Sequence, residues 1–151
     1  MSSRFTVAVH ILALLAIEKK AEPTTSEYLA RSAGTNPVVI RRILSPLRKA
    51  GLVNVQPGVG GGAILARRPE QITLRDVYRI VGEELFSYGS RKKNPFCICN
   101  RNLEPVLTGV FQNAQNALEN ALAETTVAQI AQEIETRDAR TDWDAALPVE
   151  L

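Results

Sequence analysis

The sequence predicts a mainly α-helical fold that carries one short β-hairpin. Apolar residues recur three or four positions apart through most of the chain, which is the period of helices packed along one face. Only residues 52–66 combine an alternating β-branched pattern with a glycine-rich turn, which is typical of a hairpin. The chain has 151 residues, 45% of them hydrophobic, so we expect a single domain's worth of sequence whose core needs no cross-links.

The composition also indicates the cellular compartment of the protein. Two cysteines cannot form a disulfide framework, and the N-terminus lacks the basic, apolar and small-residue segments of a secretion signal. The longest nearly apolar stretch, Phe5 to Ile17, contains Thr6 and His10 and is shorter than the about 18 apolar residues that a membrane span needs. We therefore expect a cytoplasmic protein with no membrane partner.

Basic and acidic residues are distributed unevenly along the chain. Residues 1–79 contain 12 lysines and arginines against 5 acids, a net charge of +7, whereas residues 80–151 contain 6 against 11, a net charge of −5. This asymmetry favours a polyanionic partner for the first half of the chain, with a chance fluctuation of surface charge as the alternative.

The first helix is predicted over the apolar stretch from Phe5 to Ile17. Apolar residues cover most of its surface, so it should be buried on nearly all sides, with Thr6 and His10 on its one polar stripe. Ser3 is placed to cap it. His10 is the only histidine, and a packed or interfacial imidazole is favoured over a metal-binding or catalytic one.

Two more helices are expected next, separated by a tight corner. Thr25 can cap a short helix that ends near Gly34. Asn36 followed by Pro37 is a strong start signal for the third helix, because the first helical position does not need the backbone donor that proline lacks. Pro46 should bend this third helix or fray its last turn.

The third helix has two different faces. Its core-facing stripe has the spacing i, i+3, i+4, i+7 and consists of Ile40, Ile43, Leu44 and Leu47. The opposite face is polar and basic and presents Val38, Arg42, Ser45 and Lys49, with Arg41 and Arg48 on its flank. Residues 52–56 and 63–66 then pair as strands across the turn 57–62, and Thr73 caps a helix that ends near Gly82.

The second half is expected to contain a loop, two helices and a tail. Residues 86–102 have no periodicity and many helix breakers, so they should form a loop that carries both cysteines. Residues 103–137 should form dimerisation helices, the last of them capped by Thr125 or Thr126, and residues 138–151 a polar tail in which Trp143 could dock locally. A heptad-like face implies packing against the same helix of a second subunit, with docking onto its own domain as the alternative, through Leu103, Leu107, Val110, Ala114, Ala117 and Ala121.

The order of the elements in residues 1–85 is that of a winged helix-turn-helix, and these elements lie in the basic half. An α-helix fits the major groove, arginine can donate two hydrogen bonds to guanine, and glycines let backbone amides approach the DNA backbone closely. Double-stranded DNA is therefore the expected partner. The candidate DNA-binding residues are Ser3, Ser26, Asn36, Pro37, Val38, Arg41, Arg42, Ser45, Lys49, Gly58, Gly60, Gly61 and Gly62.

Several stretches of the chain resemble the Rrf-type family of bacterial winged-helix regulators, which includes the iron-sulfur cluster regulator, the nitric-oxide-sensitive repressor and the cysteine-metabolism repressor. The resemblance rests on residues 3–12, 35–44, 50–53, 60–62 and 72–78. It implies a winged helix followed by a long helix that crosses its counterpart in a homodimer. It also implies that the helix 37–50 enters the major groove, that the hairpin reaches the minor groove, and that the dimer reads half-sites about 34 to 36 Å apart.

Two positions depart from the family pattern. Pro57 stands where members often carry a basic wing residue, so the affinity of the wing is expected to rest on its backbone amides. Ala63 stands where an aromatic residue commonly follows the last wing glycine.

Cys97 and Cys99 raise a separate question. Iron-sulfur members supply three cysteines from this loop, whereas this chain has two, so a three-cysteine site within one chain is excluded. A dimer could gather four thiols only if both loops met on the two-fold axis. We predict no cofactor and consider, in descending order, no regulatory role, a thiol redox switch favoured by the neighbouring basic residues, and a metal or iron-sulfur site.

The resulting hypothesis is a sequence-specific DNA-binding regulator, a homodimeric repressor that reads a palindromic operator through the helix 37–50 and the glycine-rich wing. The alternative is a winged-helix module that binds protein without specific DNA binding. An enzyme is not expected, because the sequence contains no nucleophile–base pair, HExxH motif or nucleotide-binding loop.

Overall fold

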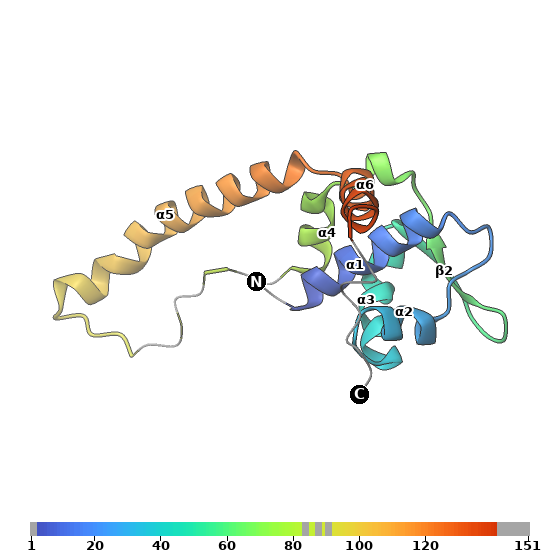
Figure 1. Ribbon diagram of the computed structural model, residues 1–151. Helices are drawn as coiled ribbons and strands as arrows, with labels where there is room; N and C mark the ends of the chain where they lie inside the picture. The colour runs from blue at the N-terminus through green and yellow to red at the C-terminus, as the bar shows by residue number, and fades with distance from the viewer. Residues whose placement is uncertain (1–2, 83–84, 87–88, 90–91, 142–151) are drawn as a thin grey trace, which may run out of the picture.

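The computed structural model describes residues 3–82, 85–86, 89 and 92–141 and confirms the mainly α-helical fold (Figure 1). In this part of the chain a single two-stranded antiparallel sheet accompanies the helices. The elements in chain order are α1 (Ser3–Glu18), α2 (Ser26–Ser32), α3 (Pro37–Lys49), β1 (Val53–Gln56), β2 (Gly62–Leu65), a 3-10 turn η1 (Pro69–Gln71), α4 (Leu74–Val81), α5 (Ile98–Ala123) and α6 (Val127–Asp138).

Polar side chains cap four of the helices, as predicted. Each accepts a hydrogen bond from the backbone N–H three residues further on, which satisfies one donor that the first helical turn leaves unpaired. Ser3, in contrast, is the first residue of α1 and does not cap it, because the helix extends N-terminally beyond the apolar stretch. The capping residues are Thr25 of α2, Asn36 of α3, Thr73 of α4 and Thr126 of α6.

The core is built around α1, which packs against α3, α4, α6 and β2. Seven of the sixteen residues of α1 are buried and five more are half-buried, whereas Thr6 and His10 are exposed, as the sequence pattern predicts. Each fully buried aliphatic side chain stabilises the fold by about 1.5–3 kcal/mol, so the apolar stripe of α3 fixes which face of that helix meets solvent. The buried residues of this stripe are Ile40, Ile43, Leu44 and Leu47.

α3 continues without interruption through Pro46 to Lys49. The backbone N–H of Ala50 donates to the carbonyl of Pro46 at 3.0 Å, so the last turn is formed and not frayed. Leu47, the residue after the proline, is fully buried, and its packing offsets the hydrogen bond that proline removes.

The hairpin is joined to the segment between α1 and α2. Its strands pair antiparallel, with Val53 opposite Leu65 and Gln56 opposite Gly62. Thr24 adds a bridge to Ala63, in which each backbone N–H donates to the other's carbonyl, at 2.9 and 2.8 Å. The position of the hairpin is therefore set by a contact distant in sequence.

α5 begins at Ile98, five residues before the expected position, so the expected loop 86–102 ends earlier and contains only one of the two cysteines. Cys99 and Pro105 lie inside the helix. The helix breakers led to the later expected start, but an asparagine side chain stabilises the earlier one. Asn100 Oδ1 accepts a hydrogen bond from the backbone N–H of Asn94 at 2.8 Å, which ties the preceding segment to the first turn of α5.

α6 packs against α1 and buries Val127 and Ala131 in the core. The backbone N–H of Val127 also donates to the carbonyl of Ile72 at 2.8 Å. α6 therefore completes the same core as residues 1–85, and the division that groups residues 103–137 as dimerisation helices stays a prediction. α5 contacts α4, and its N-terminal part projects away from this core (Figure 1).

Trp143 and most of the expected tail, residues 138–151, lie outside the described residues. Where the chain is described, none of its helices has the length and apolar character needed to cross a membrane.

Candidate nucleic-acid interface

The face of α3 turned away from the core is exposed and basic. Arg42, Ser45 and Lys49 all lie on the surface, and 53% of Val38 is exposed. Because the opposite stripe is buried, the helix cannot rotate this face inward without exposing apolar side chains to water. A helix held in this way can present arginine donors to base edges in the major groove.

The two neighbouring arginines of α3 have different surroundings. Arg41 Nη2 lies 2.7 Å from Glu27 Oε1 of α2, and the side chains are 58% and 62% exposed. Arg42 makes no ion pair with any residue that the structure describes. The helical period predicts both arginines on the same surface, but only the tertiary structure distinguishes the guanidinium that has an ion pair from the one that has none among the described residues.

A cleft of about 700 Å³ lies between α3, the start of α2 and the hairpin. Its floor and walls bring together residues from segments that are distant in sequence. The sequence-predicted residues that line it are Ser26, Arg41, Ser45, Gly58, Gly60, Gly61 and Gly62.

Other predicted residues lie outside this cleft. Pro37, Val38, Arg42 and Lys49 are on α3 without lining it, and Ser3 lies at the start of α1. Asn36 precedes α3, and its side-chain oxygen accepts the backbone N–H of Val39 at 3.1 Å. The amide nitrogen of Asn36 is thereby left as the group that can donate to a ligand.

Other residues that were not among the predicted DNA-binding residues also line the cleft: Thr25, Glu27, Leu44, Arg48, Val55, Gln56, Pro57 and Val59. Val59 occupies the tip of the hairpin and is fully exposed, with a relative exposure of 109%. The exposure of Val59 could have been predicted from the sequence, because it stands between Gly58 and Gly60 in a long turn, where no neighbouring side chain can cover it. The signal for Arg48 was its place on the basic flank of α3.

The four hairpin glycines serve two different purposes. Gly58 and Gly60 have φ of +87° and +76°, and a Cβ added to either would meet no atom within 4 Å. A Cβ on Gly61 would lie 2.1 Å from the carbonyl oxygen of Gln56, and one on Gly62 would lie 2.3 Å from that of Thr24. Close approach of DNA can therefore explain only the first two glycines, because the protein's own backbone requires the other two.

A carboxylate network fixes the segment that bridges to the hairpin. The hydroxyl of Tyr28 donates to Glu18 at 2.5 Å, and Lys20 Nζ lies 3.3 Å from the same carboxylate. The hydrogen bond from Tyr28 holds the pKa of Glu18 below its ordinary value against the opposing effect of burial, and Lys20 adds to the lowering. The same hydrogen bond raises the pKa of Tyr28. Thr24, whose backbone bridges to Ala63, also donates to Glu18 at 3.5 Å.

α5 carries an apolar face that is largely exposed. None of its residues is buried, and Leu103, Val106 and Val110 are 42%, 65% and 56% exposed. The residues expected at a dimer interface are exposed or, for Leu107, half-buried; they are Leu103, Leu107, Val110, Ala114, Ala117 and Ala121.

Polar contacts from α4 hold the C-terminal half of α5. Arg79 Nη2 of α4 lies 2.6 Å from Glu119 Oε2, and Gln115 Nε2 of α5 donates to the hydroxyl of Tyr78 of α4 at 3.3 Å and, within α5, to Glu119 Oε1 at 3.0 Å. The hydrogen bond from Gln115, followed by that from Arg79, lowers the pKa of Glu119. α5 is therefore oriented by the winged domain while its apolar face remains exposed.

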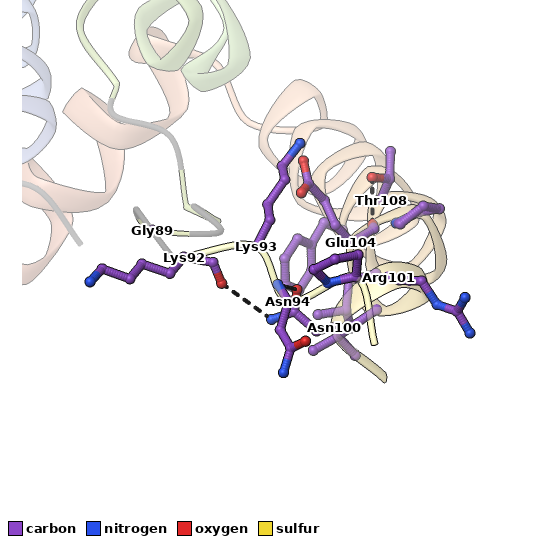
Figure 2. Close-up of a pocket in the computed structure, with 13 residues that line it drawn as sticks. Gly89, Lys92, Lys93, Asn94, Asn100, Arg101, Glu104 and Thr108 are labelled. Carbon is purple, nitrogen blue, oxygen red and sulfur yellow. Dashed lines mark hydrogen bonds between the residues drawn. The ribbon is translucent and has the colours of Figure 1, made fainter. Parts of the chain in front are cut away.

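Both cysteines lie at the start of α5. Cys97 is half-buried at the position before α5, and Cys99 is exposed in its first turn. Neither lines the nearby hollow between Gly89, residues 92–95 and α5, and Figure 2 shows Lys92 and Arg101 pointing in opposite directions there. Within the described ranges, no three His, Cys, Asp or Glu side chains gather as metal ligands.

Comparisons with known proteins agree with this arrangement. The profile of the Rrf2 family, described as iron-dependent transcriptional regulator, matches residues 1–133. YwnA of Bacillus subtilis (strain 168), which carries the name of an HTH-type transcriptional regulator, is 39% identical over 132 residues that cover 86% of this chain and 96% of that protein.

Solved structures show the same fold. The crystal structure of a transcriptional regulator from Lactobacillus plantarum superposes with a TM-score of 0.78 at 28% identity and covers 89% of this chain and 91% of that one. The structure of CymR, the global cysteine regulator of B. subtilis, superposes with a TM-score of 0.63 at 22% identity, over 88% of this chain and 96% of that one.

Proposed function

Because the chain belongs to the Rrf2 family of transcriptional regulators, we propose that it is a homodimeric repressor that reads a palindromic operator through α3 and the hairpin. The family relation makes it a DNA-binding transcriptional regulator with a winged helix-turn-helix, and the members are regulators, not enzymes. The proposal adds repression, the two-fold assembly, the symmetric operator and action in the cytoplasm, where a bacterial regulator meets the chromosome.

The observation that supports DNA reading most directly is the exposed basic face of α3 beside the glycine-rich turn. Arg42 is the proposed base-reading residue, because it is exposed and makes no ion pair with a described residue. Ser45 and Lys49 lie on the same face, one and two turns further along the helix, where they can donate to base edges or phosphates. A Cβ added to Gly58 or Gly60 would meet no protein atom within 4 Å, so the turn leaves room there for close approach of the DNA backbone.

The proposed dimer rests on the uncovered apolar face of α5. The helix has 26 residues, which at 1.5 Å per residue is about 39 Å of length for pairing. A two-fold axis across α5 would bury the same side chains from both copies, as an isologous interface requires. The two α3 helices would then address half-sites about 34 to 36 Å apart.

The test is a titration of the full-length protein onto a fluorescent duplex from its own promoter and onto a shuffled duplex of the same length. We expect nanomolar binding to the promoter, and a log Kd that rises with log salt by about 0.9 per phosphate contacted. Sedimentation of the complex should give two chains per duplex. Binding that ignores salt and sequence would refute the proposal and favour a winged-helix module that binds protein.

A role for the cysteines is a separate proposal. The family description includes iron, but the described residues of one chain offer no cluster of ligands that fits a metal. The exposed Cys99 is accessible to oxidants, so a thiol switch is the more consistent sensing role. Anaerobically purified protein should lack visible absorption bands and bound metal, whereas a cluster absorption spectrum would overturn this preference.

A further inference from the structure

One arginine on the proposed DNA-facing surface is held by a carboxylate. Arg41 of α3 and Glu27 of α2 both line the cleft beside the hairpin, and their Nη2 and Oε1 atoms lie 2.7 Å apart. Arg42, Arg48 and Lys49 form no ion pair with any other residue that the structure describes. A negative charge at this place is unexpected on a surface that receives a polyanion, because it repels phosphates.

The pair is held in place by rigid elements. Glu27 lies in the first turn of α2, a helix capped by Thr25 and anchored by the buried Leu29. Arg41 directly follows Ile40, which is fully buried on the core-facing stripe of α3. The relative position of the two helices therefore brings the guanidinium to the carboxylate.

The pair is also weak enough to be exchanged. Both side chains are more than half exposed, and such an ion pair is weak: it can compete with a single phosphate contact but not with a stronger partner. A single phosphate oxygen would accept one hydrogen bond from Arg41, as the carboxylate of Glu27 already does. A guanine edge offers two acceptors, O6 and N7, in the geometry of the guanidinium, and so can replace the carboxylate with a better partner.

We propose that Glu27 is a specificity-determining residue of this regulator that acts through Arg41. The inference rests on the proposed function. Glu27 withholds Arg41 from phosphates in non-operator DNA and releases it to a guanine at the correct position of the operator. It is a positioning residue, whose effect is to lower the affinity for wrong sequences more than the affinity for the right one.

The experiment compares Glu27→Gln with the wild-type protein on two duplexes, one selected by the wild-type protein from a random pool and one shuffled. The variant should bind the shuffled duplex about 3- to 10-fold more tightly near 0.1 M salt, because Arg41 gains one phosphate contact, and its salt slope should steepen by about 0.9. Affinity for the selected duplex should change less than about 2-fold, so the ratio of the two affinities falls.

Two further variants make the result specific. Glu133→Gln removes a similar exposed carboxylate, paired with Arg137 at 2.6 Å on α6, and should change neither affinity. In an Arg41→Ala background, Glu27→Gln should no longer alter the salt slope, because the guanidinium that it releases is absent.

The outcomes separate the two proposals. An unchanged affinity ratio for Glu27→Gln, or an effect that persists in full in the Arg41→Ala background, would overturn the role of Glu27 while DNA recognition by the wild-type protein stands. If the wild-type protein selects no sequence and its binding is independent of salt, the proposed function fails, and the role of Glu27 fails with it.

Discussion

Replacing Gly62 with alanine should detach the hairpin from the segment that joins α1 to α2. Gly62 has φ of +153°, and an alanine Cβ would lie 2.3 Å from the carbonyl oxygen of Thr24 and 2.5 Å from its carbonyl carbon. Both atoms are backbone, so no side-chain rotation relieves the overlap. The segments must separate, which breaks the paired hydrogen bonds of 2.9 and 2.8 Å between Thr24 and Ala63.

The size of the effect follows from these contacts. Two lost backbone hydrogen bonds cost about 1 kcal/mol each. Forcing a Cβ into this backbone region adds about 2 kcal/mol of strain. The free energy of unfolding should therefore fall by about 4 kcal/mol, which lowers the Tm of a chain of this length by about 12 °C.

Gly60→Ala is the matched control, because it lies in the same turn with φ of +76° and would meet no atom within 4 Å. It should cost only the backbone preference of a left-handed residue, about 1 kcal/mol. Urea unfolding followed by circular dichroism, at one protein concentration, measures both variants. If Gly62→Ala and Gly60→Ala are equally stable within about 0.5 kcal/mol, the argument from backbone overlap is refuted.

Three further outcomes can be checked independently. Arg42→Ala should lose about 1 to 3 kcal/mol of operator binding and relax discrimination at one base pair, measured by titration on operator variants; unchanged affinity would remove Arg42 from the base-reading set. Val110→Asp, which places a charge in the exposed face of α5, should shift sedimentation from dimer to monomer without unfolding the chain, whereas an unaltered dimer would place the interface elsewhere. Because the pKa of Glu119 is lowered in the folded state, its stabilising effect is present above the ordinary value of 4.5 and is lost as pH falls through the folded pKa. Glu119→Gln should therefore flatten the acid loss of stability in unfolding curves below about pH 4.5, and a loss as steep as in the wild-type protein would contradict the assignment.

Much of the fold was predictable because the signals are local. The caps at Thr25, Asn36, Thr73 and Thr126 act within one helical turn, so sequence alone locates those helix starts. The apolar stripe of α3 recurs with the period of a helix, so sequence alone predicts that this side of the helix faces the core. The start of α5 was misplaced because its stabilising contacts, such as that of Asn100 with Asn94, involve side chains whose partners the local pattern does not specify.

The candidate site was only partly predictable for a related reason. The sequence predicts the basic face of α3 and the glycines of the hairpin and assigns DNA binding to all of them. In the structure, these residues have different surroundings. Among the described residues, Arg41 forms an ion pair and Arg42 does not, because the partner carboxylate of Glu27 lies on a different helix, α2. Gly62 is required by the backbone of Thr24, which is far away in sequence.

The amino-acid sequence by itself therefore determined most of the helices, the hairpin and the charge of the α3 face that is proposed to read DNA, since these depend on neighbours within a few residues. Only the tertiary structure decided that α6 packs against α1, that α5 keeps an uncovered apolar face and that a carboxylate holds one arginine. Each of those features depends on which distant segments meet, and that is a property of packing in three dimensions.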